Sequence, residues 1–223
     1  MTTTSTTTLT TAPLAPLLTR LFAQADGATS TAYIEIPCQE RERLLQSRHE
    51  YRDFYTRLKD LWLPVSPETG RLLYMLARTI KARNIIEFGT SFGISTLHLA
   101  AALRDNGGGR LISCEFEPSK VAGARQHLAD GGLTDLVEIR EGDALITLAT
   151  DLPDTIDLLL LDGAKALYSD ILTLVEPRLR PGALIVADNA DYSPAYLNRI
   201  RNSDNGYLSV PFAEDVELSL RTG

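Results

Sequence analysis

Two apolar stretches in the second half of the chain are each followed by residues that could bind a metal ion or move a proton. The group comprises Asp162 and Lys165 after residues 156–161, and Asp188 and Asn189 after residues 183–187. Two carboxylates and an amide are hard oxygen ligands of the kind that Mg²⁺ prefers, and Lys165 can reach the same point as Asp162. An acid after a strand also commonly caps a helix, so a structural role for these acids stays open.

A glycine-containing turn follows an earlier apolar run, with the sequence Glu-Phe-Gly-Thr-Ser-Phe-Gly-Ile-Ser over residues 87–95. Gly89 and Gly93 let a ligand approach the backbone where a Cβ would clash. Their GxxxG spacing differs from the GxGxxG of dinucleotide-binding loops, in which the second glycine makes room for a pyrophosphate. The turn therefore favours a nucleoside without a diphosphate, although ordinary strand-to-helix turns also contain two glycines.

Two further acids follow neighbouring apolar runs. Glu115 ends the run 111–115, about 20 residues beyond the glycine turn, where a carboxylate can accept hydrogen bonds from both ribose hydroxyls. Asp143 follows the next run and is placed either to bind the edge of an adenine or to cap the helix that begins at Ala144. Both interpretations of Asp143 stay open.

These residues need a sheet that brings the strand ends together. From residue 84, short apolar runs alternate with helical stretches, which is typical of βαβ units in a mostly parallel sheet. We expect strands at 84–88, 110–115, 136–140, 156–161 and 183–188, helices at 95–103, 118–129, 144–148 and 166–179, and a C-terminal antiparallel hairpin of 206–211 with 216–221. The predicted fold is a Rossmann-like, doubly wound α/β fold with a seven-stranded, mostly parallel sheet. In such sheets ligands bind beyond the carboxyl ends of the strands, where the acids fall.

The N-terminal region has a different pattern. Residues 1–12 are rich in threonine and are expected to form a disordered tail. A leucine stripe over 14–22 predicts a helix that ends near Gly27, and a second helix is expected over about 39–62. After the turn at 63–67, a third helix begins at Pro67.

Composition excludes several classes of protein. The 22 basic and 29 acidic residues give a net charge of -7, whereas nucleic-acid binding normally shows a basic surface. No apolar run approaches the roughly 18 residues of a membrane span, and the N-terminus has neither a secretory nor a transit-peptide pattern. Cys38 and Cys114 lack the spacing of a zinc site or a disulfide framework. We expect a cytoplasmic protein with a small-molecule partner, and neither nucleic acid nor membrane.

With these motifs together, the sequence resembles the class I S-adenosylmethionine-dependent methyltransferases, and among them the catechol and caffeoyl-CoA O-methyltransferases. The resemblance covers roughly residues 63–223 and, more weakly, the N-terminal helices. It depends on the glycine turn, on the run ending at Glu115, and on three further segments: 65–70, 162–168 and 187–189.

The resemblance implies S-adenosylmethionine as cofactor, bound by the domain 63–223. Its methionine part would be held by Val65, Glu87, Gly89 and Ser95, with Thr90, Ser91 and Gly93 in the same turn. Glu115 would hold the ribose, and the adenine would lie against Phe116 with Asp143 and Ala144 at its edge. Asp162 would border the cofactor as well.

The resemblance also implies a catalytic centre and an assembly. Asp162, Asp188 and Asn189 would bind a divalent cation such as Mg²⁺, Lys165 would act as general base, and Asp162 would be the second catalytic residue. Residues 13–62 would form a helical lid over cofactor and acceptor, and the protein would be a homodimer. The implied reaction is methyl transfer to a hydroxyl of a small, catechol-like aromatic acceptor.

Two departures from the family pattern keep an alternative open. Gly163 and Ala164 stand where caffeoyl-CoA enzymes usually have another acid, and neither Glu214 nor Glu217 is in register with the glutamate that orients the second hydroxyl in catechol enzymes. A metal-independent N- or carboxyl-methyltransferase on the same fold is therefore the alternative. The GxxxG spacing disfavours a nicotinamide-dependent dehydrogenase, and a non-catalytic scaffold would not need acids and a lysine at the strand ends.

Overall fold

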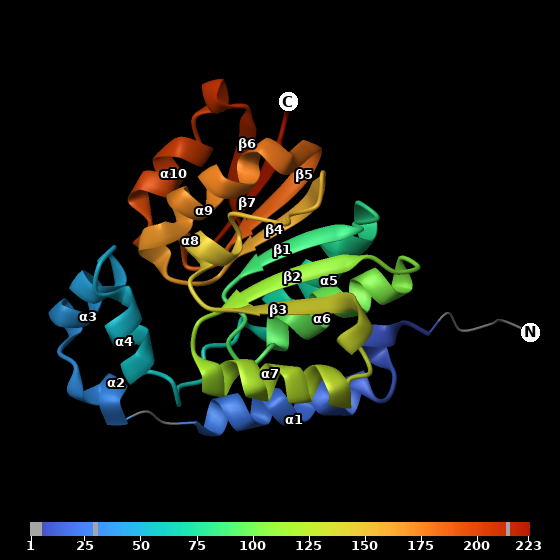
Figure 1. Cartoon of the computed structure of the whole chain (residues 1–223), viewed down its shortest axis with the longest axis horizontal. Helices are drawn as coiled ribbons and strands as arrows, with labels where there is room; N and C mark the ends of the chain where they lie inside the picture. Colours follow the sequence, from blue (N-terminus) through green and yellow to red (C-terminus); the bar gives the residue numbers. More distant parts are fainter. Residues whose placement is uncertain (1–5, 29–30, 213–214) are drawn as a thin grey trace, which may run out of the picture.

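The computed structural model describes residues 6–28, 31–212 and 215–223, and within them a seven-stranded sheet runs through the centre of the molecule (Figure 1). The strand order is β3-β2-β1-β4-β5-β7-β6; the first five strands pair in parallel, and β7 is antiparallel to both β5 and β6. The strands are β1 Asn84–Phe88, β2 Arg110–Glu115, β3 Val137–Glu141, β4 Ile156–Leu161, β5 Leu179–Ala187, β6 Tyr207–Phe212 and β7 Val216–Arg221. The predicted doubly wound sheet with a C-terminal hairpin is confirmed.

Helices cover both faces of the sheet, as Figure 1 shows. One face carries α1 Leu14–Gly27, α5 Pro67–Thr79, α6 Ile94–Asp105 and α7 Pro118–Asp130, and the other carries α8 Ala144–Thr147, α9 Tyr168–Val175 and α10 Pro194–Ile200. Side chains alternate between the two faces along each strand, so Ile85 and Leu158 enter one core whereas Ile86 and Leu159 enter the other. All of β4 is buried, which explains its unbroken apolar run.

The N-terminal helices differ from the prediction. The helix expected over 39–62 is instead two short helices, α3 Cys38–Leu45 and α4 Tyr51–Arg57, preceded by α2 Thr31–Glu35. The break follows from Ser47, whose hydroxyl accepts a hydrogen bond from the backbone N–H of Glu50 and so offers the chain an alternative to helical hydrogen bonding. α1 agrees with the prediction, and its buried leucines join the core under α6 and α7.

Part of the expected tail is ordered. Thr8–Thr10 form a 3-10 helix, and both the backbone N–H and the hydroxyl of Thr8 donate to the carboxylate of Asp105 at the end of α6. Sequence periodicity gave no signal for this contact because it depends on one polar side chain 97 residues away. The rest of the expected tail, residues 1–5, lies outside the described residues.

Smaller differences concern the second half. A 3-10 turn over Lys165–Leu167 precedes α9, so the helix expected from 166 begins at Tyr168. α10 was not predicted; it begins with Pro194 in the first helical position. In the described ranges, no helix is long and apolar enough to cross a membrane.

Candidate functional site

A cavity lies beyond the carboxyl ends of β1, β2, β3 and β4. Its walls are the segments that follow these strands, with α4 on the opposite side: Gly89, Ser91, Glu115, Phe116, Glu117, Gly142, Asp143, Ala144, Asp162, Gly163 and Ala164 from the sheet side, and Tyr51, Arg52 and Tyr55 from α4. We call it the nucleoside cavity. The fold therefore brings seven of the sequence-predicted residues into one wall: Gly89, Ser91, Glu115, Phe116, Asp143, Ala144 and Asp162.

The glycine turn is fixed by its neighbours on both sides. The N–H groups of Gly89 and Thr90 both donate to the carbonyl of Cys114 at 3.2 Å. Gly89 has a φ of +104°, and a Cβ there would lie 2.5 Å from the carbonyl oxygen of Asp162. Glycine is therefore required at this position for two reasons, its backbone conformation and the approach of the segment after β4.

Ser91 in the same turn has two features that are typical of a ligand-binding residue. It has a φ of +47°, which is uncommon for a residue other than glycine, asparagine or aspartate. Its hydroxyl is buried in the nucleoside cavity wall and has no hydrogen-bond partner among the described residues. Buried hydroxyls normally have a hydrogen-bond partner. The Ser91 hydroxyl is therefore available to form a hydrogen bond with a ligand in the cavity.

Glu87 lies underneath the turn rather than in the cavity wall. It is fully buried, and its carboxylate accepts hydrogen bonds from the hydroxyls of Ser95, Thr96 and Ser113, each at 2.6 Å. Burial raises its pKa to about 7, although the three hydroxyls act in the opposite direction. Glu87 and Ser95 thus support the turn from the core.

Glu115 has a fixed orientation at the end of β2. One carboxylate oxygen accepts the N–H of Ser91 at 2.8 Å, and the other accepts the N–H groups of Phe116 and Glu117 at 3.0 Å. These bonds tie the end of β2 to the glycine turn. A carboxylate has about four acceptor positions, so Glu115 can still accept hydrogen bonds from a ligand's hydroxyls.

Asp143 performs one of the two roles that the sequence left open, the helix cap, and it also lies in the wall of the nucleoside cavity. One oxygen accepts the N–H of Leu145 and caps α8, and the other accepts the guanidinium of Arg52 at 2.5 Å. The residue therefore caps a helix and also lines the nucleoside cavity.

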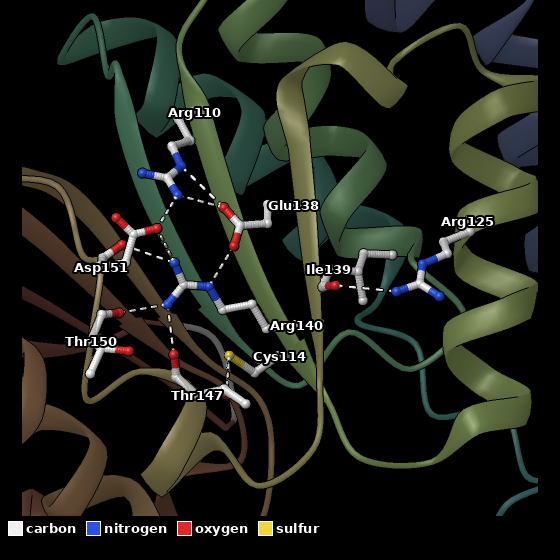
Figure 2. Close-up of polar contacts among 9 residues, drawn as sticks. All are labelled: Arg110, Cys114, Arg125, Glu138, Ile139, Arg140, Thr147, Thr150 and Asp151. Carbon is white, nitrogen blue, oxygen red and sulfur yellow. Dashed lines mark hydrogen bonds and ion pairs between the residues drawn. The ribbon is translucent and has the colours of Figure 1, made fainter.

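The far end of α8 is held by Arg140 (Figure 2). Its guanidinium donates to the carbonyls of Thr147, Thr150 and Asp151. Glu138 and Arg110 complete this network, and the side chain of Arg140 is only 10% exposed. Because α8 carries Ala144, the network fixes one wall of the nucleoside cavity from outside.

A second, larger cavity of about 630 Å³ adjoins the first. We call it the acceptor cavity. Its apolar part comes mainly from the N-terminal segment and its polar part from the ends of β4 and β5: Phe22, Phe54, Tyr55, Leu58, Leu63, Val65 and Tyr192 on one side, and Asp162, Lys165, Asp188, Asn189 and Asp215 on the other. Tyr55, Leu63, Asp162 and Gly163 line both cavities, so the two meet there.

Buried charges are concentrated where the cavities meet. Lys165 is 6% exposed, and its ammonium donates to Asp162 and to the hydroxyl of Tyr168, both at 2.9 Å. Burial disfavours its charge, but Tyr168 and Asp162 hold its pKa well above the usual value. Burial and the nearby Asp162 carboxylate raise the pKa of Asp188 to about 8. The carboxyl groups of Asp162 and Asp188 therefore lie close to each other and to the single buried ammonium group of Lys165.

The remaining predicted residues take more distant positions. Val65 lines the acceptor cavity, Thr90 lines a small recess behind the turn, and Gly93 packs against Ala124 of α7. Asn189 lines the acceptor cavity and donates its amide to Asp215.

The structure bears on both positions at which the sequence departs from the family pattern, the residue after Asp162 and the C-terminal glutamate. A Cβ on Gly163 would meet the ring of Phe88 at 2.6 Å, which explains why no larger residue stands after Asp162. Glu217 is buried and accepts hydrogen bonds from Arg201 and Ser209, away from the acceptor cavity, whereas Glu214 lies outside the described residues.

Comparisons with known proteins agree with this geometry. Residues 86–190 match the family model described as a methyltransferase domain. A catechol O-methyltransferase of Niastella koreensis is 39% identical over 130 residues, which are 57% of this chain and 58% of that protein. One of Mycobacterium tuberculosis is 35% identical over 127 residues, 57% of each chain. The chain thus spans little more than half the length of these curated relatives.

The solved structure of the O-methyltransferase TomG from Streptomyces achromogenes, in complex with S-adenosylmethionine, has a TM-score of 0.63 and 27% identity. The alignment covers 86% of this chain and 94% of that one. The chain is thus similar to S-adenosylmethionine-dependent O-methyltransferases, in sequence over its strand-end segments and in fold over most of its length. The unpaired Ser91 hydroxyl, the fixed Glu115 and the close approach at Gly89 are features that fit a bound nucleoside ligand.

The residues at the ends of β4 and β5 have the donor chemistry of a divalent-cation site. Asp162, Asp188 and Asn189 all line the acceptor cavity and carry hard oxygen atoms. Among the described residues, no group of three or more His, Cys, Asp or Glu side chains is arranged to hold a metal ion.

Sequence reasoning missed the cavity-lining residues of α4. Tyr55 lines both cavities, and Arg52 and Tyr51 line the nucleoside cavity. Their only signal was helical periodicity, which predicts a buried face but not which cavity that face covers.

Glu87 gives the protein a pH dependence of stability. Its pKa rises from an ordinary 4.5 to about 7 on folding, so its contribution is fully present below pH 4.5 and is lost as the pH rises through 7. Between pH 5 and pH 8 we expect wild type to lose about 2.5 kcal/mol more stability than Glu87→Gln, whose amide cannot ionise. Urea unfolding at several pH values measures this. Glu68→Gln, at an exposed site, is the control, and parallel profiles for wild type and Glu87→Gln would contradict the account.

Proposed function

We propose that this protein transfers the methyl group of S-adenosylmethionine to a hydroxyl of a small, catechol-like aromatic acceptor with the help of Mg²⁺. The observation that carries the proposal is the junction at Asp162, which lines both the nucleoside cavity and the aromatic acceptor cavity. The catechol O-methyltransferases among the relatives and the cofactor bound to TomG support it.

The residues of the nucleoside cavity would bind the cofactor through hydrogen bonds and through packing around its adenine. Glu115 would accept hydrogen bonds from the ribose hydroxyls, and Phe116, Asp143 and Ala144 would surround the adenine. Ser91 would use its free hydroxyl at the methionine end. When bound, S-adenosylmethionine supplies an electrophilic methyl group on a sulfonium.

Glu87 and Ser95 would act on the methionine end indirectly, through the turn that they support. Gly89, Thr90 and Gly93 would shape that turn, and Val65 would border the methyl group from the acceptor side. The proposal therefore divides the predicted set into residues that touch the cofactor and residues that position those that do.

The acceptor hydroxyl must lose a proton. A phenol has a pKa of about 10, so at neutral pH it is mostly un-ionised and a poor nucleophile. Lys165 would take that proton at Nζ, but Asp162 and Tyr168 stabilise its charged form, which leaves little neutral lysine. A second positive charge near Asp162 would offset this effect, which is the physical reason to propose a cation.

Asp162, Asp188 and Asn189 would hold the cation, whose Lewis acidity would favour the ionised hydroxyl. Lys165 and the ligands share one wall, so a hydroxyl placed in the acceptor cavity faces the base and the metal ligands together. The ring of such an acceptor would pack among Phe22, Phe54 and Tyr55. This arrangement suits an aromatic molecule with a hydroxyl at its edge.

The assembly and the location are proposals as well. We propose residues 13–62 as the lid, with α2 to α4 over the cavities and α1 packed on the sheet domain. The exposed apolar side chains Leu208, Val210 and Phe212 of β6 offer a surface for a homodimer, which ultracentrifugation tests. The two free cysteines fit the reducing cytoplasm.

Metal removal tests the role of the cation. With labelled S-adenosylmethionine and catechol, we expect EDTA to lower methyl transfer at least about 100-fold and Mg²⁺ to restore it, because a Lewis acid is worth several kcal/mol to the ionised hydroxyl. Asp188→Ala should stay inactive with Mg²⁺, whereas Asp191→Ala, an exposed neighbour, should stay active. Full activity in EDTA would favour a metal-independent methyltransferase that acts on nitrogen or a carboxylate.

Lys165→Met tests the base. Methionine has a similar length and no charge, so we expect turnover to fall by about 10²- to 10⁴-fold, the range for loss of a general base. Binding of S-adenosylhomocysteine, measured by calorimetry, should change little. Lys59→Met, at an exposed site before Trp62, is the matched control. Equal turnover of Lys165→Met and wild type would remove Lys165 from the mechanism.

A further inference from the structure

The segment that carries α3 and α4 has a small core of its own. Ile36, Leu44, Phe54 and Leu58 form a buried cluster that is separate from the two cores of the sheet. Figure 1 shows α2, α3 and α4 grouped to one side of the sheet domain. Such a segment can change its distance from the sheet without exposing its own core.

Two ion pairs join this segment to the sheet domain within the part of the chain that the structure describes. Arg52 of α4 pairs with Asp143 at 2.5 Å, and Arg48 pairs with Asp170 of α9 at 2.6 Å. Tyr51, whose ring belongs to the core on the α8 and α9 face, accepts a hydrogen bond from Arg52. The two ion pairs have similar N···O distances and partly exposed side chains, but they lie at different positions relative to the nucleoside cavity.

Only the Arg52 pair borders the nucleoside cavity. Arg52 and Asp143 both line it, whereas neither Arg48 nor Asp170 lines either cavity. The Asp143 side chain is 14% exposed and that of Arg52 is 51% exposed, so the pair joins the cavity wall to the outer rim. Asp143 is held in place because its other oxygen caps α8.

We propose that Arg52 is a cofactor-retaining residue: its ion pair with Asp143 closes the nucleoside cavity at the α4 side, and the cofactor leaves only after this pair breaks. The inference depends on the proposed function for the identity of the ligand. It adds a role for α4 that the glycine turn and the strand ends do not supply. Because the pair is partly exposed, added salt should weaken it and speed ligand release.

The test compares Arg52→Gln with Arg48→Gln in the full-length protein. The probe is S-adenosylhomocysteine without an acceptor, so the readout is ligand release rather than turnover. Trp62 is the only tryptophan of the chain and stacks on Phe92 of the glycine turn at 4.2 Å, so its fluorescence can follow release in stopped flow. Calorimetry gives the equilibrium affinity of the same variants.

We expect Arg52→Gln to release the ligand about tenfold faster than wild type, as for loss of a charge-assisted hydrogen bond, and Arg48→Gln to stay within about twofold. Equal release from Arg52→Gln and wild type would overturn the proposal. Equal acceleration in both variants would also overturn it, since the two pairs would then act only as general tethers. No binding to wild type would instead overturn the proposed function and this inference together.

Asp143→Asn distinguishes loss of the ion pair from a local distortion of the cavity wall as the cause of faster release. Asparagine is an equally good helix cap and has nearly the same shape, so this variant keeps α8 and the cavity wall beside the proposed adenine position, and it removes the charge that Arg52 needs. We expect the double variant Arg52→Gln, Asp143→Asn to release the ligand no faster than Arg52→Gln alone, because the two side chains act as one pair. Multiplied effects in the double variant would show that they act independently and would contradict the closure.

Discussion

The backbone after β1 lies directly against the backbone after β4, and both halves of the site depend on that contact. The N–H of Asp162 donates to the carbonyl of Phe88 at 2.8 Å, and a side chain on Gly89 would collide with the Asp162 carbonyl. The ring of Phe88 covers Gly163 in the same place. Asp162 is thereby fixed at the border of two cavities, where a cofactor and an acceptor can meet.

The second constraint is electrostatic. The chain buries Glu87, Asp188 and Lys165 close to this contact, and burial of a charge is costly unless it has partners. Three hydroxyls satisfy Glu87, whereas Asp162 and Asp188 compete for Lys165. The first arrangement stabilises a turn. The second places two carboxyl groups beside one ammonium in the cavity wall, which is the chemical reason to propose a cation there.

Much of the fold could be predicted from the sequence because burial on both faces leaves a continuous apolar run. The strands 84–88, 110–115 and 156–161 have the predicted bounds for this reason. The prediction of one helix over 39–62 was wrong. Charged residues dominate this stretch, and the side chain of Ser47 interrupts the helix between α3 and α4 by accepting the N–H of Glu50. α10 was not predicted because it is only 7 residues long and has too few apolar residues to show a helical period.

The candidate site could be predicted in part, because residues directly after strands converge in a parallel sheet. Glu115, Asp143 and Asp162 lie together in one wall for that reason. Sequence position could not show that Glu87 faces the core, since strand ends give no signal for which side chain turns inward. Nor could it show Arg52 or Tyr55, because their place depends on how a separate helical segment packs over the sheet.

Calorimetric titration with S-adenosylmethionine tests the central claim most directly, with protein treated with EDTA and a parallel titration with NAD. The account predicts that the sulfonium cofactor binds one site per chain without added metal and that NAD does not bind, because the glycine turn has no room for a pyrophosphate. Binding of NAD with no binding of S-adenosylmethionine would contradict the account and the site assignments built on it.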